Sequence, residues 1–125
     1  DRLAWVGGLG DDCLPTYLSV GVQAFTSSIS NTAPKLAVEL ARLGGLMPGD
    51  AHDPYFSKIS PLMRTYVHPI YALREKVKGY EVSVMKAFMD RVGLVGGPVR
   101  PPLEDTRAEH LAEVDRLVKV YAPYL

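Results

Sequence analysis

The fold is decided by two short apolar runs near the start of the chain. The first is Leu3-Ala4-Trp5-Val6, which ends at Gly7-Gly8-Leu9-Gly10, and the second is Val22-Gln23-Ala24-Phe25, which ends at Thr26-Ser27-Ser28. Each run is short, favours β structure and is closed by turn-forming residues, a pattern typical of a buried strand. We therefore predict strands at Leu3–Val6 and Val22–Phe25.

A short helix is predicted between these strands. Asp11 or Asp12 is expected to cap a helix from about Cys13 to Val20, and Gly21 is expected to end it. Strand, helix and strand joined by tight connections form a βαβ unit with parallel strands. Two parallel strands alone do not make a stable sheet, and the sequence enters an apolar run at Leu3, directly after Asp1 and Arg2. We therefore expect the chain to be a piece of a longer protein.

The rest of the chain is predicted to be helical. Apolar residues recur at spacings of three and four over 34–43, 54–78, 81–92 and 107–121. Pro61 and Pro69 should kink or split the second of these stretches. The expected inward residues of the third are Val82, Met85, Phe88, Met89 and Val92. Asp105 or Thr106 is expected to cap the last helix, after a proline-rich connector over 93–102.

Composition and charge exclude several classes of protein. Apolar residues make up 47% and charged residues 22% of the 125 residues, as in a globular domain. Fourteen basic residues balance fourteen acidic ones, which argues against nucleic acid as the main partner. There is no apolar run of membrane-spanning length and no signal-peptide layout, so a cytoplasmic location is expected.

The cysteine and the histidines do not indicate a reactive or metal site. Cys13 is the single cysteine, which excludes an internal disulfide, and we interpret it as a small packing residue. His52, His68 and His110 are not spaced as metal ligands. Neither a metal nor a cofactor is therefore expected. Gly8-Leu9-Gly10 is not a dinucleotide-binding fingerprint, because Cys13 stands where its third glycine would be.

Four segments in this order carry a resemblance to a known family. They are Gly8-Leu9-Gly10-Asp11-Asp12, Phe25-Thr26-Ser27-Ser28-Ile29-Ser30-Asn31, Gly79-Tyr80-Glu81-Val82-Ser83-Val84-Met85-Lys86 and Gly97-Pro98-Val99-Arg100-Pro101-Pro102-Leu103. Together they resemble the end of a member of the dihydrodipicolinate synthase/N-acetylneuraminate lyase family. The last segment is most similar to the 5-dehydro-4-deoxyglucarate dehydratase branch.

The resemblance implies an α/β fold, the C-terminal part of a (β/α)₈ TIM barrel followed by a helical appendage. Residues 1–45 would be the last two βα units and residues 46–125 the helical region. The implied enzyme is a lyase that forms a Schiff base and takes 5-dehydro-4-deoxy-D-glucarate to 2,5-dioxopentanoate. It would be a cytoplasmic homo-oligomer, a tetramer or a dimer, acting in glucarate catabolism. The Schiff-base lysine of the family precedes the first residue here, so we expect this chain alone to be inactive.

Substrate-binding residues are expected in the loops that follow the two strands, because TIM-barrel active sites lie at the carboxyl ends of the strands. Our candidates are Gly10, Asp11, Asp12, Thr26, Ser27 and Ser28, with Ser27 favoured among the hydroxyls. Turn formation, helix capping and hydrogen bonding within the loops are the alternative roles for the same residues. Asn31 is interpreted as a loop or cap residue, Arg100 as an anchor of the connector, and Tyr71 as a packing residue.

Lys86 is not a candidate for the Schiff-base lysine. It lies in a predicted helix beyond both strands, and we interpret it as a structural or surface residue. A Schiff-base amine needs a desolvated position at the strand ends, where its pKa can fall.

Two other functions stay open. Within the same class, the parent protein would be a 2-keto acid aldolase or synthase similar to dihydrodipicolinate synthase. In a different class, the 125 residues would form a noncatalytic helical module for oligomerisation that hides its two strands against a second copy.

Overall fold

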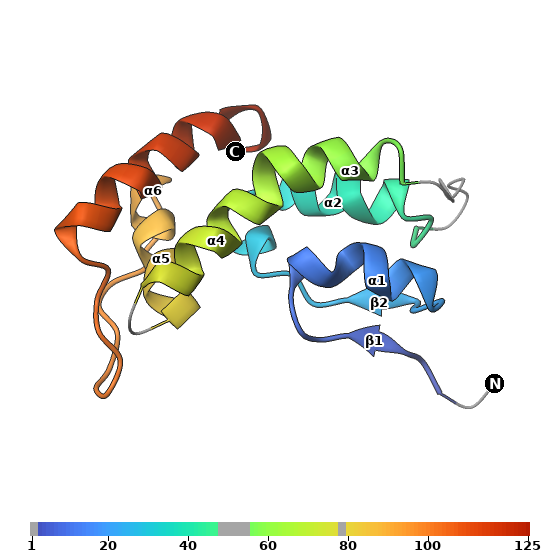
Figure 1. Ribbon diagram of the computed structural model, residues 1–125, viewed down its shortest axis with the longest axis horizontal. Coiled ribbons are helices and arrows are strands. Elements are labelled where there is room, and N and C mark those ends of the chain that lie inside the picture. The colour runs from blue at the N-terminus through green and yellow to red at the C-terminus, as the bar shows by residue number, and fades with distance from the viewer. Residues whose placement is uncertain (1–2, 48–55, 78–79) are drawn as a thin grey trace.

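The structure is a computed structural model that describes residues 3–47, 56–77 and 80–125 (Figure 1). Two strands, β1 (Val6–Gly7) and β2 (Ala24–Phe25), lie below the helix α1 (Leu14–Ser19) that connects them. Further helices lie on the other side of α1 from the strands. Among them are α2 (Pro34–Leu43) and α3 (Ile59–Leu62), which run side by side.

The remaining helices pack against one another at the other end of the molecule. They are α4 (His68–Lys76), α5 (Tyr80–Arg91) and α6 (Ala108–Tyr121), and each contacts both of the others. Short helical turns complete the path: η1 (Asp11–Cys13), η2 (Ile29–Asn31), the π-helical η3 (Met63–Val67) and η4 (Ala122–Tyr124). In the part of the chain described, no helix is both long and apolar enough to cross a membrane.

The parallel βαβ unit is confirmed, with shorter strands than predicted. Val6 pairs with Ala24 and Gly7 with Phe25, in parallel register. Backbone hydrogen bonds from Gln23 N to Trp5 O (3.0 Å) and from Thr26 N to Gly7 O (2.8 Å) extend the pairing on both sides. The loop after β1 and the loop after β2 therefore leave the sheet at the same edge.

The expectation that both strands are buried is wrong for the described residues. Trp5 is 65% exposed and Val6 56% exposed, because α1 covers only one face of the pair. On the covered face Gly7 touches the ring of Tyr17 so closely that a Cβ there would lie 2.4 Å from a ring carbon. The other face of the strands is open.

One cluster of buried side chains spans the helices. It includes Leu14 of α1, Leu36 and Leu40 of α2, Ile59 of α3, and Val114 of α6, each with 0% exposure. The predicted stripe of α2 is confirmed, since Leu36, Leu40 and Leu43 are all buried. The core thus draws on both of the predicted regions, 1–45 and 46–125, whose boundary remains a prediction.

Of the two prolines expected to kink or split the predicted helix over 54–78, only Pro69 stands at a change of helix type, since the helical residues run without a gap from Ile59 to Lys76. Residues 54–55 and 78 lie outside the described ranges. Pro61 lies within α3, and Pro69 lies in the first turn of α4, directly after the π-helical η3. A proline has no N–H to donate and its ring collides with the carbonyl four residues earlier. The wider π-helical turn relieves this collision and lets the chain continue in the same direction.

Two predicted helix caps are wrong. The N-cap of α1 is Cys13, and the N-cap of α6 is Arg107; neither makes a side-chain capping hydrogen bond. Asp11 instead lies in η1 and bonds to the next loop, while Asp105 accepts a hydrogen bond from Val99 N (2.8 Å) in the connector. Both carboxylates are used to hold loops rather than helix ends.

The inward face of α5 is rotated relative to our prediction. Val84, Met85 and Phe88 are buried, but Val82 is 46% exposed. The helix packs against both α4 and α6, so the face between them is buried. Val82 points away from this packing, toward the loops that follow the strands, where it lines two hollows.

Candidate functional site

Asp11 joins the two loops that follow the strands. Its side chain is fully buried, and its Oδ2 accepts hydrogen bonds from the backbone N–H groups of Ser28 (2.9 Å) and Ile29 (3.2 Å). Because β1 and β2 are adjacent and parallel, the first residues after each strand lie close enough for this contact. Asp11 therefore fixes the position of the second loop relative to the first.

Tyr71 of α4 attaches this pair of loops to the helical region. Its hydroxyl donates to Asp11 Oδ2 (3.0 Å) and accepts from Asp11 N (2.7 Å). Burial raises the pKa of Tyr71, and the negative charge of Asp11 raises it further, so the hydroxyl keeps its proton at neutral pH. A Cβ at Gly10 would lie 2.8 Å from the Tyr71 oxygen, so glycine is what allows this close approach.

Arg74 lies one turn beyond Tyr71 on the same helix. Its guanidinium carbon lies 3.9 Å from the centroid of the Tyr71 ring, a stacked cation–π contact, and the residue is only 5% exposed. A series of contacts thus runs from the loops into α4. Asp11 holds the Tyr71 hydroxyl by hydrogen bonds, and the Tyr71 ring stacks against Arg74.

Two hollows lie at this junction and share Arg74 and Val82. The larger has a volume of about 460 Å³, and its other lining residues are Leu9, Asp12, Tyr71, Glu75 and Leu103. The smaller has a volume of about 200 Å³, and its other lining residues are Ser28, Asn31, Met85 and Lys86. The loops after both strands and the helices α4 and α5 therefore line two neighbouring hollows.

Of the predicted substrate-binding residues, the structure brings Asp12 and Ser28 to these hollows. Gly10 and Asp11 are buried behind them, where Asp11 bonds within the protein. Any direct contact from this acidic pair would therefore come from Asp12, which is exposed.

The other predicted hydroxyls bond within the protein, to strand β1 and within the loop after β2. Thr26 Oγ1 donates to Gly7 O (3.4 Å), and Ser27 Oγ accepts from Ser30 N (3.0 Å). Asn31 Nδ2 donates to Ser28 O (3.1 Å), in agreement with its expected loop role. Substrate contact by Thr26 and Ser27 remains a prediction.

Sequence reasoning missed the helical residues of this region, Arg74 and Val82, and did not connect Tyr71 and Lys86 with the loops. Tyr71 and Arg74 are three residues apart, and Val82 and Lys86 are four apart, so each pair shares one face of its helix. The available signal in the sequence was a tyrosine and an arginine on one helix face, with a lysine on a later helix. This pattern did not show that the two helix faces meet.

The expected structural role of Lys86 is confirmed in part. Its Nζ donates to the carbonyl oxygen of Pro98 (2.5 Å) and so attaches the connector to α5. The connector approaches so closely that a Cβ at Gly96 would lie 2.0 Å from the Lys86 carbonyl oxygen. The same lysine lines the smaller hollow on the side of α5 that faces the loops.

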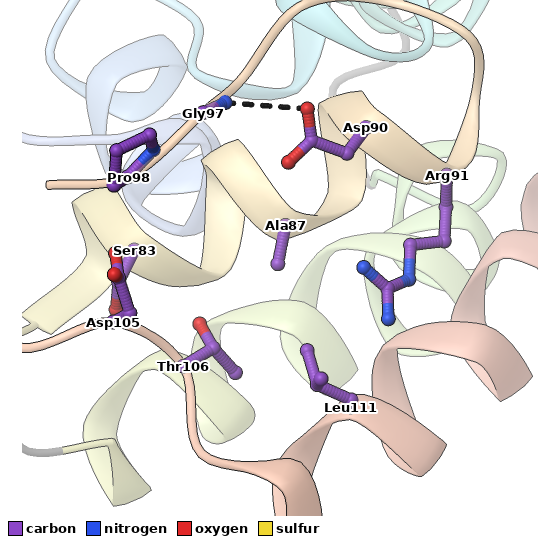
Figure 2. Close-up of a pocket in the computed structure, with 9 residues that line it drawn as sticks. All are labelled: Ser83, Ala87, Asp90, Arg91, Gly97, Pro98, Asp105, Thr106 and Leu111. Carbon is purple, nitrogen blue, oxygen red and sulfur yellow. Dashed lines mark hydrogen bonds between the residues drawn. The ribbon is translucent and has the colours of Figure 1, made fainter.

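A third hollow of about 340 Å³ lies on a different face of α5, between the connector and α6 (Figure 2). Figure 2 shows the Asp90 carboxylate beside the backbone of Gly97, from which it accepts a hydrogen bond (3.2 Å). Asp105 holds Val99 N, and Arg91 pairs with Asp115 (3.0 Å). Its charged groups thus secure the connector and α6, and we do not regard it as the candidate site.

The described residues do not form a metal site. No group of three or more His, Cys, Asp or Glu side chains suited to a metal is found among the described residues. His68 and His110 lie on different helices, Cys13 is half-buried, and His52 lies outside the described ranges. The polar groups at the strand ends therefore remain the candidate site.

The sequence is similar to a known protein family and to several of its curated members. The model of the Dihydrodipicolinate synthetase family matches residues 1–121. A probable 5-dehydro-4-deoxyglucarate dehydratase of Rhodococcus opacus is 38% identical over 122 residues, which are 95% of this chain and 38% of the relative. The proteins of the same name from Bradyrhizobium diazoefficiens and Rhizobium rhizogenes are each 34% identical over 95% of the chain, and 36% and 38% of their lengths are covered.

The chain therefore spans well under half the length of these curated relatives. Within that part, the family match extends across both strands, the loops that follow them and the helices that enclose the two hollows. The chain belongs to the Dihydrodipicolinate synthetase family.

Proposed function

We propose that this chain is part of a lyase that dehydrates and decarboxylates 5-dehydro-4-deoxy-D-glucarate to 2,5-dioxopentanoate. The observation that carries the proposal is the identity of 34–38% to relatives named as probable dehydratases of this compound, over 95% of the chain. The position of Asp12 and Ser28 beside two hollows adds to it, since both are suited to contact a hydroxylated acid.

In this proposal β1 and β2 are the seventh and eighth strands of a (β/α)₈ barrel. Their parallel pairing and the connecting helix α1 agree with such a position. The helix α2 then closes the barrel, and the helices from residue 46 onward form an appendage. The two hollows would lie at the carboxyl ends of the strands, where barrel enzymes hold their substrates.

The reaction proposed is Schiff-base chemistry on a lysine that lies outside these 125 residues. The lysine amine forms an imine with the keto carbon of the substrate, which acidifies the neighbouring carbon and permits loss of a hydroxyl group as water. Loss of carbon dioxide and hydrolysis of the imine complete the turnover. In sum, the substrate dianion and one proton give the product monoanion, one water and one carbon dioxide.

The residues of this chain would bind and orient the substrate rather than react with it. Asp12 is placed to accept hydrogen bonds from substrate hydroxyls, and Ser28 is placed to donate one. Asp11 and Tyr71 would act as positioning residues, because they hold the two loops together. We expect the complete protein to be a homo-oligomer and this chain alone to be inactive.

The test is turnover by the complete purified protein. Incubation with 5-dehydro-4-deoxy-D-glucarate should release carbon dioxide and 2,5-dioxopentanoate in equal amounts, measured by gas trapping and mass spectrometry. Condensation of pyruvate with an aldehyde, without this turnover, would favour a 2-keto acid aldolase instead. A folded protein that turns over neither this compound nor any other 2-keto sugar acid would refute the proposal.

A further inference from the structure

Tyr121 of α6 donates a hydrogen bond to the backbone of a different helix. Its side chain is fully buried, and its hydroxyl donates to the carbonyl oxygen of Tyr66 (2.5 Å). Its ring meets the rings of Tyr66 and Phe88 edge to face, with 5.7 Å and 5.0 Å between the centroids. A phenol enclosed in this way has one orientation, so its hydroxyl is directed at one carbonyl. Burial, and then the negative charge of Asp11, raise the pKa of Tyr121, so the hydroxyl keeps the proton that it donates.

The carbonyl of Tyr66 belongs to the π-helical turn η3. In this turn the N–H of His68 donates to the carbonyl of Met63, five residues earlier, instead of the four residues of an α-helix. Pro69 follows and has no N–H to donate. The segment therefore has fewer backbone donors than an unbroken helix, and Tyr121 supplies a donor from outside it.

The register of this turn decides which way the side chains of α4 point. A π-helical turn contains one residue more than an α-helical turn, and each residue of an α-helix turns the chain by about 100°. A return of η3 to the α-helical register would therefore rotate α4 by about 100° relative to α3. The hydroxyl of Tyr71 would then leave Asp11, to which it bonds at 2.7 Å and 3.0 Å in the observed register.

The turn η3 lies between α6 and the loops of the candidate site. It contacts α6, which carries Tyr121, and it contacts η1, which contains Asp11. Tyr71 follows the turn in α4 and bonds to Asp11, and Asp11 holds the backbone N–H groups of Ser28 and Ile29. A series of contacts through η3 thus leads from Tyr121 to both loops.

We propose that Tyr121 is a positioning residue of the candidate site. Its hydroxyl holds η3 in the π-helical register, which keeps Tyr71 on Asp11 and so keeps Asp12 and Ser28 in place beside the two hollows. The effect on substrate rests on the function proposed above, in which Asp12 and Ser28 bind it. A residue that only packed the core would stabilise the protein without changing how those two residues bind.

The first experiment measures turnover of 5-dehydro-4-deoxy-D-glucarate by the complete protein, well below its unfolding temperature. Tyr121→Phe removes the hydroxyl and keeps the ring. It should raise KM roughly fivefold and change kcat by less than about twofold, because the displaced loops bind the substrate and do not react with it.

Tyr124→Phe is the matched control for Tyr121→Phe. The Tyr124 ring also meets that of Tyr66 edge to face (5.0 Å between the centroids), but its hydroxyl makes no hydrogen bond within the described part of the chain. This variant should leave both KM and kcat unchanged. A KM for Tyr121→Phe equal to that of Tyr124→Phe would refute the positioning role.

A cycle of single and double variants tests the route through Tyr71. Tyr71→Phe should raise KM at least as much as Tyr121→Phe, because it removes the hydroxyl that bonds to Asp11 directly. The double variant should be no worse than Tyr71→Phe alone, because both substitutions act through the same hydrogen bond. Effects on KM that multiply would show that Tyr121 acts by another route, and would refute the proposal.

Hydrogen–deuterium exchange gives a readout that needs no turnover. The N–H groups of Ser28 and Ile29 donate to Asp11, so their exchange reports whether the two loops stay joined. Tyr121→Phe should make the peptide over 28–31 exchange roughly fivefold faster. Val114→Ala, a substitution in the buried core of the same helix, should lower the thermal midpoint without this effect. Equal acceleration in Val114→Ala would mean a loss of overall stability and would refute the positioning role.

A second variant reaches the turn by a different route. Pro69→Ala returns a backbone N–H beside η3, so the α-helical register can compete with the π-helical one. It should raise KM and accelerate exchange over 28–31 as Tyr121→Phe does, and it decides the question if Tyr121→Phe does not fold. Unchanged KM and exchange in Pro69→Ala would then refute the proposal.

The two measurements separate this inference from the dehydratase proposal. Turnover with KM and exchange unchanged in Tyr121→Phe would leave the enzyme function standing and refute the positioning role, and faster exchange with an unchanged KM would also refute it. Faster exchange in Tyr121→Phe and Tyr71→Phe but not in Val114→Ala, in a protein that forms no 2,5-dioxopentanoate, would support the positioning role and refute the enzyme function.

Discussion

The carboxylate of Asp11 lies among three donors from two parts of the chain, the backbone N–H groups of Ser28 and Ile29 and the hydroxyl of Tyr71. A buried carboxylate is stable only when hydrogen bonds replace its lost water. Each of these donors is in turn satisfied by Asp11. Removal of the side chain would therefore leave several buried polar groups without a partner.

The structural role of Asp11 is tested by comparing the substitutions Asp11→Ala and Asp12→Ala. We expect Asp11→Ala to lower the free energy of unfolding of the complete protein by about 2 kcal/mol or more, because buried donors lose their acceptor. Asp12→Ala, at an exposed position, should change the unfolding free energy by less than about 0.5 kcal/mol. Urea denaturation measures both. Equal losses from the two substitutions would contradict the assigned difference.

The tyrosines give a prediction about alkaline pH. Burial, and then the charge of Asp11, raise the pKa values of both Tyr71 and Tyr121 above that of an unfolded tyrosine. Above pH of about 10 the unfolded chain releases protons that these residues keep in the folded state, so stability must fall as pH rises. Tyr71→Phe should make that fall less steep. Unfolding measured from pH 8 to 11 checks this, and an unchanged slope would argue against the raised pKa.

Little of this network was accessible from the sequence. Asp11 and Tyr71 are separated by 60 residues, and local patterns carry no information about such a contact. The loop positions of Asp12 and Ser28 were predictable because residues after parallel strands meet at one edge of a sheet. Both residues line hollows together with Arg74, and that arrangement was not predictable because it depends on how α4 and α5 pack.

Among the elements, α5 is held to its connector by several close contacts. Asp90 accepts hydrogen bonds from the backbone N–H groups of Gly96 and Gly97, and Lys86 donates to Pro98. Gly96 lies directly against the Lys86 carbonyl, with no room for a side chain. The connector therefore helps to place the Lys86 ammonium.

Gly96→Ala should disturb this junction. The new Cβ would overlap a backbone oxygen, which cannot move without moving α5, and such overpacking costs roughly 1–3 kcal/mol. Gly8→Ala is the matched control, because a Cβ at Gly8 would meet nothing within 4 Å. Thermal unfolding of the complete protein should show a lower midpoint for Gly96→Ala only. A midpoint equal to that of Gly8→Ala would show that the connector yields freely.

Helix positions were predictable where apolar spacing and punctuating residues agree, as for α2 between Pro34 and Gly44. The inward face of α5 was not, because Val82, Val84, Met85 and Phe88 are apolar on several sides of the helix. Only contact with α4 and α6 decides which of them are buried. The predicted N-caps of α1 and α6 were wrong for a related reason, because Asp11 and Asp105 accept hydrogen bonds from loop residues instead.

At the scale of the whole molecule, one face of the strand pair is open and the helices form a continuous core. Leu3, Trp5 and Val6 are all more than half exposed, whereas the buried cluster runs from α1 to α6. This distribution agrees with the proposed position at the end of a barrel, in which further strands would cover that face. It also agrees with the share of the relatives' length that the chain spans.

The same proposal predicts where the chemistry occurs. The lysines in the described part of the chain are on or directly beside helices rather than at the strand ends, and Lys86 is tethered to Pro98. A Schiff-base amine in the complete protein is therefore expected outside residues 1–125. The binding residues are expected inside them, at the edge shared by the two loops.

The most direct measurement is reductive trapping. The complete protein is incubated with pyruvate and borohydride, its intact mass is determined, and the modified lysine is located by peptide mapping. We predict one added three-carbon group for each chain, on a lysine outside residues 1–125, and no adduct on the 125-residue chain alone at 13.7 kDa. A folded complete protein without an adduct, or an adduct on Lys86, would contradict the account.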